Sequence, residues 1–455
     1  MAKYKLLKAQ KEFLEVPHKS GLDVALYQGG YGSGKTWSGS LLGILLCLRY
    51  KGIKGLVGAQ TFPLVRDTTL VTYLEHLEAL GFKENRDYFF KKSESKLIFK
   101  NGSEILFRSL DEPGKIKSLN LGFVEIEEMS DTKESTFKML LGRLRQAIKP
   151  EWKELGFQYR LFGHTNPEPD KGWLYKVFNS SKVNYRKLIA STTENTFLSD
   201  SFVESLKDAY DEDYYNINVL GQDGDYSSGL VVKGFSNCNK TSCEGIECKH
   251  CTKSNVKTVN YFPDMDLHIT CDFNVDPMSW ALAHKTEDKV FFFDEIVIEN
   301  TTTEKTCEEF LRRYPKHTGK IIINGDASGD NRSTASEFTN YATIKNTLKD
   351  FGYIDNVEFK LKGFNPRIKS RVAAFNSKVL NLKGIRCVFV DHKCKWVIYN
   401  LENLKYKVGT SLIDAPSHHQ IKQSKELKFL MHIYDAISYL VDFYWPIKIE
   451  QPEKE

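Results

Sequence analysis

The stretch Gly29-Gly30-Tyr31-Gly32-Ser33-Gly34-Lys35-Thr36 decides how the first half of this chain folds. It fits the pattern GxxxxGK followed by Ser or Thr, and it stands between an apolar run, Val24 to Tyr27, and a helical stretch, Thr36 to Arg49. Glycines in this position let backbone N–H groups surround phosphate oxygens at a helix N-terminus. The pattern predicts an ATP-binding loop, and its flanking elements disfavour the alternative of a glycine-rich turn without a ligand.

Each residue type in this loop has a chemical reason to be there. Lys35 would place its charge on the β- and γ-phosphate oxygens, and the Thr36 hydroxyl would ligate Mg²⁺. The residues of the loop predicted to bind ATP are Gly29, Gly30, Gly32, Ser33, Gly34, Lys35 and Thr36.

Outside the loop, apolar runs alternate with amphipathic stretches, as in Gly55 to Ala59 followed by Thr68 to Leu80. This alternation of strand and helix patterns predicts a parallel sheet covered by helices. Between Tyr88 and Leu110 the runs become short and are broken by Asn101-Gly102, a dipeptide that favours a tight hairpin turn. We therefore expect a small antiparallel β segment added to the sheet of an α/β domain.

The second half begins a new pattern of strands. Apolar runs predict strands at Leu267 to Asp272, Met278 to His284 and Lys289 to Ile298, then a helix at Thr303 to Tyr314 and a strand at Lys320 to Gly325. Three strands, a helix and a further strand predict a mixed sheet.

Length and composition indicate two globular domains. The chain has 455 residues, and a single core stops growing at roughly 250 to 300. From about residue 227 to 261 the periodicity disappears and Gly, Ser, Asn, Lys and Cys gather, so we predict domains at 1–226 and 262–455 with a linker at 227–261.

Charge and hydropathy exclude little beyond a membrane span. A net charge of +5 does not by itself indicate nucleic acid, although the Lys- and Arg-rich stretch Lys360 to Lys378 would make a local basic patch. The longest apolar stretch, Leu41 to Leu48, is far shorter than the roughly 20 residues that span a bilayer, and no export signal is recognisable. We expect neither membrane anchoring nor export.

A second apolar strand ends in acids. The run Leu121 to Glu128 predicts a buried strand whose Glu127 would hold Mg²⁺ through water and whose Glu128 would polarise the attacking water. The alternative is that both are solvated residues at the start of a helix capped by Asp131 and Glu134. Glu125 interrupts the apolar run, which is unusual.

At this point the sequence resembles the large terminase subunits of tailed bacteriophages, whose ATPases carry a P-loop, an acidic pair on a strand and a Thr-Asn-Pro-type coupling segment. Here that segment is His164-Thr165-Asn166-Pro167, in which Thr165 and Asn166 would sense hydrolysis, although a simple Asn-Pro turn explains it equally well in isolation. The resemblance implies an α/β protein: a P-loop ATPase domain of the ASCE type followed by a ribonuclease H-like nuclease domain.

The same resemblance suggests further residues of the ATP site. Gln10 looks like an adenine-contacting glutamine, and Arg66 or Arg143 looks like an arginine finger, although isolated Gln and Arg residues are usually surface groups. Many terminases have a basic residue inside the P-loop where this chain has Tyr31. The charge that stabilises the transition state must then come from elsewhere, in cis or from a neighbouring subunit.

Three separated aspartates fit the nuclease. Asp272 and Asp326 each end a predicted strand, and Asp435 lies in a helical stretch near the end, the order found in the terminase nuclease. Such carboxylates hold two Mg²⁺ or Mn²⁺ ions about 4 Å apart, although helix caps and turns are the alternative. His432 shares a helical face with Asp435 and would lie near the metals, and Glu295 is a further candidate ligand.

Four of the nine cysteines cluster between the predicted domains. Cys238, Cys243, Cys248 and Cys251 have the spacing CX4CX4CX2C, which would suit a tetrahedral Zn²⁺ site, since metal binding would stabilise a polar segment too short to fold alone. Four free thiols are the alternative, because cytosolic cysteines stay reduced.

The resemblance implies a subunit that hydrolyses ATP to move double-stranded DNA into a procapsid and cuts concatemeric DNA. It also implies the portal protein and the small terminase subunit as partners, a homo-oligomeric ring on the procapsid from a chain that is monomeric in isolation, and a place in the host cytoplasm rather than in the mature virion. One rival is a P-loop helicase or recombination ATPase whose second domain only binds DNA, but no later helicase motifs follow Thr165. The other is a second domain that serves only as a platform for the portal.

Overall fold

The computed structural model describes residues 5–15, 21–168, 172–180, 182, 184–224, 229–237, 254–274, 276–331, 337–407, 410 and 412–447. The chain divides into two compact units: residues 1–203 with 213–225, and residues 204–212 with 226–450. Within the described ranges, no helix combines the length and apolarity that a membrane span requires.

The first unit is built on a sheet in the order β3-β4-β5-β2-β6-β7-β1-β8. Its strands are β1 (Leu22–Gly29), β2 (Lys54–Ala59), β3 (Tyr88–Lys91), β4 (Lys96–Phe99), β5 (Glu104–Ser109), β6 (Phe123–Glu127), β7 (Tyr159–Thr165) and β8 (Tyr185–Ala190). From β5 to β8 all neighbours are parallel, so the carboxyl ends of β2, β6, β7 and β1 meet at one edge. The predicted parallel sheet is confirmed.

The predicted antiparallel β segment is also present. Strands β3 and β4 pair antiparallel with each other, and β4 pairs antiparallel with β5. Asn101 and Gly102 make the turn between β4 and β5, where Gly102 has φ +81° and its N–H donates to the carbonyl of Phe99 at 2.8 Å. A left-handed backbone at this position is the conformation that glycine adopts at little cost.

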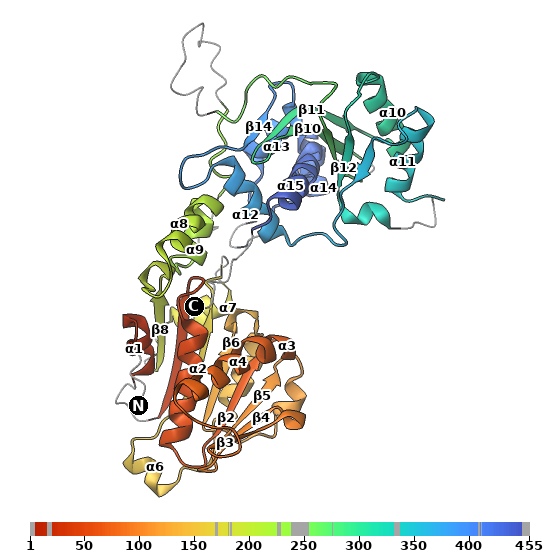
Figure 1. Cartoon of the computed structure of the whole chain (residues 1–455). Helices are drawn as coiled ribbons and strands as arrows, with labels where there is room; N and C mark the ends of the chain where they lie inside the picture. The colour runs from red at the N-terminus through yellow and green to blue at the C-terminus, as the bar shows by residue number, and fades with distance from the viewer. Residues whose placement is uncertain are drawn as a thin grey trace. The chain divides into compact units, whose positions relative to one another are not determined.

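Helices cover both faces of this sheet (Figure 1). They are α1 (Lys8–Leu14), α2 (Lys35–Arg49), α3 (Phe62–Leu64), α4 (Leu70–Ala79), α5 (Glu134–Leu141), α6 (Pro150–Glu154) and α7 (Trp173–Phe178), with a π-helical turn η1 (Val65–Thr69) before α4. Two more helices, α8 (Asp200–Ala209) and α9 (Glu212–Asn218), follow β8, and most of α8 belongs to the second unit. One core joins α1, α2 and α4 to Tyr27 and Phe162, and the other joins α5 and α7 to Val24 and Ile126. Alternate strand residues thus point into opposite cores, as the period of two requires.

The second unit has a mixed sheet in the order β13-β12-β9-β10-β11-β14. Its strands are β9 (Leu267–Asp272), β10 (Met278–Lys285), β11 (Val290–Ile298), β12 (Ile321–Gly325), β13 (Val357–Phe359) and β14 (Val388–Val390). Strands β9, β10 and β11 are antiparallel neighbours, whereas β12 runs parallel to β9. The predicted mixed sheet is confirmed.

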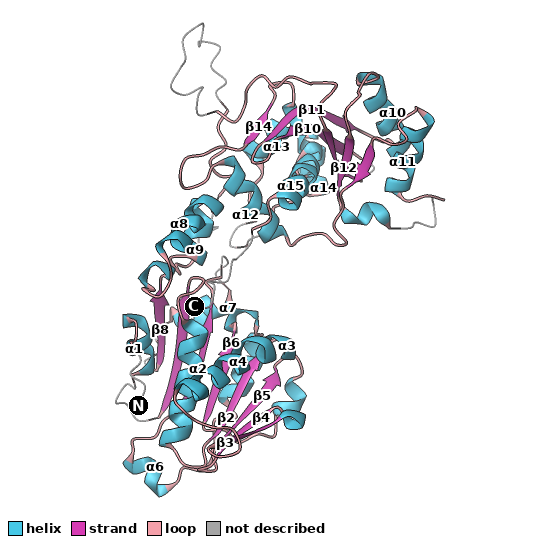
Figure 2. Ribbon diagram, viewed as in Figure 1, coloured by secondary structure: helices cyan, strands magenta, loops and turns pink. Residues whose placement is uncertain are grey.

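Two helical layers enclose this second sheet, as the cyan and magenta elements of Figure 2 show. The helices are α10 (Thr303–Arg313), α11 (Asn340–Asp350), α12 (Ile368–Val379), α13 (Lys395–Asn403), α14 (His418–Gln423) and α15 (His432–Tyr444). One core joins α10 and α11 to Trp280 and Phe293, and the other joins α12, α13 and α15 to Phe292 and Val390. Helix α15 packs on β9, β10 and β12, which brings its residues to the centre of the sheet.

A buried histidine makes the stability of this unit depend on pH. His268 of β9 is 3% exposed, and burial, only partly opposed by its contact with Asn324, lowers its pKa to about 4. Because the unfolded chain binds a proton near pH 6.5 and the folded chain does not, the free energy of unfolding should fall by about 3 kcal/mol as the pH drops from 6.5 to 4. Urea unfolding across this range should show the decrease, and His268→Asn should reduce it; an equal decrease in both proteins would contradict this assignment.

Candidate active sites

The predicted phosphate-binding loop follows the central strand β1 and leads into α2. A Cβ atom at Gly30 would lie 2.3 Å from the carbonyl oxygen of Val219 and 2.4 Å from Oγ1 of Thr192, so this position has no room for a side chain. Gly34, with φ +78°, is the residue before the helix. The glycines are therefore required by close packing and by backbone conformation, and α2 begins at Lys35 with its N-terminus at the loop.

Two polar groups beside the loop suit a nucleotide. The Ser33 hydroxyl is buried, and no hydrogen-bond partner for it lies among the described residues. Gln10 of α1 is 5% exposed, and its Nε2 would lie 2.5 Å from a Cβ at Gly34. A buried hydroxyl without a partner costs free energy that a phosphate oxygen would recover. The predicted contact residues Gln10 and Ser33 thus lie at the loop.

The acidic pair lies at the same sheet edge. The Thr36 hydroxyl donates to Oε1 of Glu127 at 3.2 Å, and the Thr69 hydroxyl donates to Oε2 of Glu127 at 2.7 Å. Glu127 is 3% exposed, so the interpretation of this residue as a solvated helix-start residue is wrong. Glu128 follows with φ +43°, a strained backbone for a non-glycine residue that turns its side chain away from the strand direction.

The predicted coupling residues contact Glu128. Its Oε2 accepts a hydrogen bond from the Thr165 hydroxyl at 3.1 Å and from the backbone N–H of Asn166 at 3.3 Å. Burial raises the pKa of Glu128, and the nearby charge of Lys35 opposes that rise. Loop, acidic pair and coupling segment therefore form one connected group of side chains.

Glu125 has a partner that explains its place in an apolar strand. It is fully buried and accepts hydrogen bonds from the Tyr73 hydroxyl at 2.6 Å and from Nε2 of His164 at 3.0 Å. The other ring nitrogen of His164, Nδ1, lies 3.3 Å from Oε1 of Glu127. One imidazole therefore lies between two buried carboxylates, and α2 approaches it closely enough that a Cβ at Gly39 would be 2.5 Å from Glu125 Oε1.

These contacts set the charge of the central histidine. Burial alone would lower the pKa of His164, but Glu127 and Glu125 outweigh burial and raise it to about 10. Burial also raises the pKa of Glu127, but His164, Thr69 and Lys35 reverse this and hold it below its usual range. The positive charge of His164 thus compensates the negative charge of Glu127, the carboxylate predicted to hold Mg²⁺.

Tyr31 replaces the basic residue expected in the loop. Its hydroxyl lies 3.1 Å from that of Tyr214, its backbone N–H donates to the carbonyl of Asn218 at 2.8 Å, and burial raises its pKa. The Thr192 hydroxyl donates to its carbonyl at 2.7 Å. Tyr31 therefore ties the loop to α9 rather than facing a phosphate with a charge.

The two candidate arginine fingers lie in different places. Arg66 is exposed on η1, the turn that also carries Thr69, and its side chain pairs with Asp67 at 2.6 Å. The backbone carbonyl of Arg143 accepts from the N–H of Leu121 at 2.9 Å. Leu121 precedes the amino end of β6, so Arg143 lies at the edge of the sheet opposite the loop. Arg143 would therefore act only on a neighbouring subunit.

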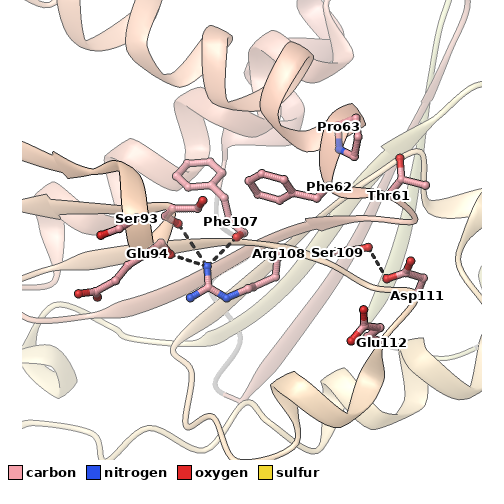
Figure 3. Close-up of a pocket in the computed structure, with 11 residues that line it drawn as sticks. Thr61, Phe62, Pro63, Ser93, Glu94, Phe107, Arg108, Ser109, Asp111 and Glu112 are labelled. Atoms are coloured by element: carbon pink, nitrogen blue, oxygen red, sulfur yellow. Dashed lines mark hydrogen bonds between the residues drawn. The ribbon is translucent and has the colours of Figure 1, made fainter.

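A separate cavity of about 680 Å³ opens where β2 and β5 end (Figure 3). Its lining includes Glu94, Asp111 and Glu112. Among the described residues of the lining, the single cation is Arg108, and its Nη1 donates to backbone carbonyls, including that of Glu94 at 2.7 Å. An acidic lining with an engaged arginine does not suit phosphates, so the loop remains the candidate ATP site.

The three predicted nuclease aspartates come from neighbouring elements. Asp272 ends β9 and Asp326 follows the adjacent parallel strand β12, where the backbone N–H of Asp326 donates to the carbonyl of Cys271 at 3.0 Å. Asp435 lies on α15, which packs on β9. The Tyr439 phenol, half-buried on α15, has its pKa raised to about 12, chiefly by loss of solvent and in part by all three carboxylates, with Arg371 opposing the rise. The structure thus brings the three acids into one region.

Each aspartate has a protein partner, and two of the three partners, Arg371 and Asn365, were not predicted from the sequence. Oδ1 of Asp435 accepts from Nη2 of the buried Arg371 at 2.6 Å, and Oδ1 of Asp326 accepts from Nδ2 of Asn365 at 2.6 Å. Nδ1 of the predicted neighbour His432 lies 3.0 Å from Oδ2 of Asp272. Burial raises the pKa of Asp435 to about 6, with Arg371 opposing the rise and Asp272 adding to it.

The donor chemistry fits Mg²⁺ or Mn²⁺, since the three side chains offer carboxylate oxygens from converging elements. Yet no group of three or more His, Cys, Asp or Glu side chains within the described ranges is already arranged as a metal-binding cluster. Arg371 occupies an oxygen of Asp435 that an ion would use. Metal binding there would require Asp435 to exchange this partner, whereas Asn365 contacts only Oδ1 of Asp326.

Glu295 has a different role from the one predicted. Its two carboxylate oxygens accept from the backbone N–H groups of Trp396 and Val397, each at 2.8 Å, at the start of α13. Burial raises its pKa to about 7, partly offset by these two bonds. The structure thus makes Glu295 a cap for α13, and this contact does not support a fourth metal ligand.

The cysteine cluster Cys238, Cys243, Cys248 and Cys251 lies outside the described residues. The cysteines that are described, Cys47, Cys271, Cys307, Cys387 and Cys394, are buried free thiols.

Sequence reasoning missed Thr69, Tyr73, His164 as an ionic centre, Asn365 and Arg371. For His164 a signal existed, because a glutamate within an apolar strand demands a buried partner. For Arg371 and Asn365 the sequence offered only a basic stretch. Their partners lie 64 and 39 residues away, so only the fold could identify them.

Comparisons with known proteins agree with this architecture. Residues 23–222 match a family model described as phage terminase large subunit. The PBSX phage terminase large subunit of Bacillus subtilis (strain 168) is 27% identical over 443 residues, which cover 91% of this chain and 89% of that protein. The large terminase of a thermophilic bacteriophage has the same fold: its structure covers 96% of this chain and 99% of its own, with TM-score 0.60 at 14% identity, and its complex with ATP-gamma-S gives TM-score 0.58. Residues 23–222 thus match the phage large terminase family, and most of the chain is similar to one phage large terminase subunit.

Proposed function

We propose that this chain packages viral DNA: it hydrolyses ATP to move double-stranded DNA into a procapsid and cuts concatemeric DNA at a two-metal endonuclease site. The match of residues 23–222 to the phage large terminase model and the similarity to the PBSX large subunit support the proposal. The observation that carries it is the presence, on two units of one chain, of a glycine-rich loop whose Thr36 contacts Glu127 of the acidic pair, and of three aspartates carried by neighbouring elements, two at the ends of β9 and β12 and one on α15. A motor without a nuclease would need only the first group.

ATP hydrolysis follows from the residues around the loop. Lys35 would bind the β- and γ-phosphate oxygens, and Thr36 with Glu127 would hold the Mg²⁺, the latter through water. Mg²⁺ supplies charge neutralisation on the phosphates when bound. Glu128 would orient and polarise the attacking water, and the Thr165 and Asn166 that contact it would register the change when the γ-phosphate leaves. Because Tyr31 carries no charge, the arginine finger would come from Arg66 or from a neighbouring subunit's Arg143.

DNA cleavage would use Asp272, Asp326 and Asp435 to hold two Mg²⁺ or Mn²⁺ ions. When bound, such ions supply an activated water and neutralise charge on the phosphate. His432 would orient the Asp272 carboxylate and Asn365 that of Asp326, through the contacts they already make. Arg371 would release Asp435 as the ions bind.

The wider setting is part of the proposal. The chain would act with the portal protein and the small terminase subunit as a homo-oligomeric ring docked transiently on the procapsid in the host cytoplasm. Its domains would be residues 1–226 and 262–455, and the four clustered cysteines of the 227–261 linker would bind Zn²⁺.

Three measurements on the purified chain test the proposal. Double-stranded DNA should stimulate ATP hydrolysis, and Mn²⁺ should support nicking of supercoiled DNA. Crystals soaked in Mn²⁺ should show paired metal density beside Asp272, Asp326 and Asp435. A chain that hydrolyses ATP but neither nicks DNA nor binds Mn²⁺ there would instead be a motor whose second unit only binds DNA or the portal.

A further inference from the structure

The segment between β13 and α12, residues 360–367, is a surface loop attached to the candidate nuclease site. Its attachment is Asn365, whose Nδ2 donates to Oδ1 of Asp326 at 2.6 Å and whose Oδ1 accepts from the backbone N–H of Ala327 at 2.9 Å. An amide that satisfies both its donor and its acceptor on one aspartate turn has a fixed orientation. These two hydrogen bonds therefore fix the position of the loop relative to Asp326.

The start of the loop is also held. The backbone N–H of Lys360 donates to the carbonyl of Ile323 at 2.9 Å, and Nδ2 of Asn324 donates to the carbonyl of Lys360 at 2.8 Å. Lys362 pairs with Asp442 of α15, and its Nζ also reaches the carbonyl of that residue at 3.0 Å. Gly363 and Phe364, which lie between Lys362 and Asn365, are thus held in place from both sides.

That place presents an aromatic ring to solvent. Phe364, the neighbour of Asn365, is 76% exposed, more than any other large hydrophobic side chain in the described ranges. Scattered apolar side chains on a surface are ordinary. Phe364 differs because the next residue along the chain is hydrogen-bonded to the candidate catalytic Asp326, and Phe364 lines the same small pocket as Gly325 and Tyr439 beside that aspartate.

The charge around Phe364 favours a polyanion. No acidic residue occurs in the sequence from Lys360 to Val390. Lys360 and Lys362 pair with Glu358 and Asp442, and two further basic side chains, Arg367 and Lys369, are exposed at the start of α12. Lysine and arginine side chains in such a run bind the DNA backbone by replacing condensed counterions. The basic stretch noted in the sequence thus lies on the side of the candidate nuclease site.

We propose that this loop contacts duplex DNA beside the cut and that Phe364 enters a base step there. A phenyl ring gains nothing from phosphates or water, and the apolar surfaces of DNA are the faces of its bases. In a duplex those faces are covered by stacking, so the ring reaches them by opening one step, as inserted apolar wedges do in minor-groove binding proteins. The inference rests on the proposed action on DNA and adds how the cutting site engages it.

The test compares Phe364→Ala with two matched variants. Phe364→Trp keeps an aromatic ring, and Phe351→Ala removes another exposed phenylalanine, 59% exposed at the end of α11. Each variant cuts a perfect duplex and the same duplex with an unpaired bubble. Phe364→Ala should cut the perfect duplex about 10-fold more slowly and the bubble nearly as fast as the unaltered chain, since there the step is already open. Phe364→Trp and Phe351→Ala should cut both normally.

A second measurement separates this inference from the proposed function. Duplexes containing 2-aminopurine should become more fluorescent when the unaltered chain binds without metal, because the base step opens, and should not do so with Phe364→Ala. Binding with this rise but without cutting would refute the nuclease and leave the wedge standing. Cutting with equal rates of Phe364→Ala on both substrates, or binding of the unaltered chain without the rise, would overturn the wedge.

Discussion

Glu128→Gln is expected to lower the rate of ATP hydrolysis by about 10²- to 10⁴-fold, the usual contribution of a positioned general base, while ATP still binds. Glutamine keeps the size of the side chain and accepts the same hydrogen bonds from Thr165 and Asn166. It loses the charge that would polarise water. Phosphate release under saturating ATP, together with titration of a fluorescent ATP analogue, measures turnover and affinity separately.

Two variants frame this result. Glu127→Gln should weaken the binding of Mg²⁺ with ATP, because Glu127 contacts Thr36 at the predicted metal position. Lys35→Ala should weaken ATP binding itself, since the ammonium is lost from the phosphates. If Glu128→Gln instead hydrolyses ATP at the original rate and Glu127→Gln does not, the two roles assigned to the pair would have to be exchanged.

Asp272→Asn is expected to lower Mn²⁺-dependent nicking by about 10³-fold, because a lost charged ligand costs several kcal/mol of metal-assisted stabilisation. The substitution keeps the side-chain shape at the end of β9, so the sheet should persist. ATP hydrolysis by the other unit should not change. Nicking of supercoiled plasmid and phosphate release, measured on one preparation, give both rates.

The control for this variant is Asp264→Asn, which neutralises an exposed aspartate in the turn before β9. It should nick DNA at the original rate. Nicking retained in Asp272→Asn would count heavily against a catalytic role for the three aspartates and in favour of a DNA- or portal-binding second unit.

Much of the fold was predictable because its signals are local. The loop Gly29–Thr36 combines a strand, a turn and a helix within a short stretch, and the apolar run Leu267 to Asp272 gives the bounds of β9 as observed. Short edge strands such as β14 escaped prediction. Three residues carry too little periodicity to reveal a strand, and this one is held by pairing with β11.

In the candidate sites too, local sequence signals were predictable and contacts between distant elements were not. Residue types at strand ends pointed to Glu127, Glu128, Asp272 and Asp326, because parallel strands deliver their carboxyl ends to one edge. The partners of those residues depend on packing between distant elements. Arg371 reaches Asp435 from α12, and a sequence alone does not show which of many arginines will be buried beside an acid.

The close approach of α2 to the pair of Glu125 and His164 has a consequence for how this sequence can vary. Since a Cβ at Gly39 would lie 2.5 Å from Glu125 and 2.7 Å from His164, these three positions occupy one fixed volume. A larger residue at position 39 becomes acceptable only if one of the other two shrinks, and removing either of those leaves an uncompensated charge next to the ATP site. In descendants of this chain the three positions should therefore change together or stay as they are, as a single evolutionary unit.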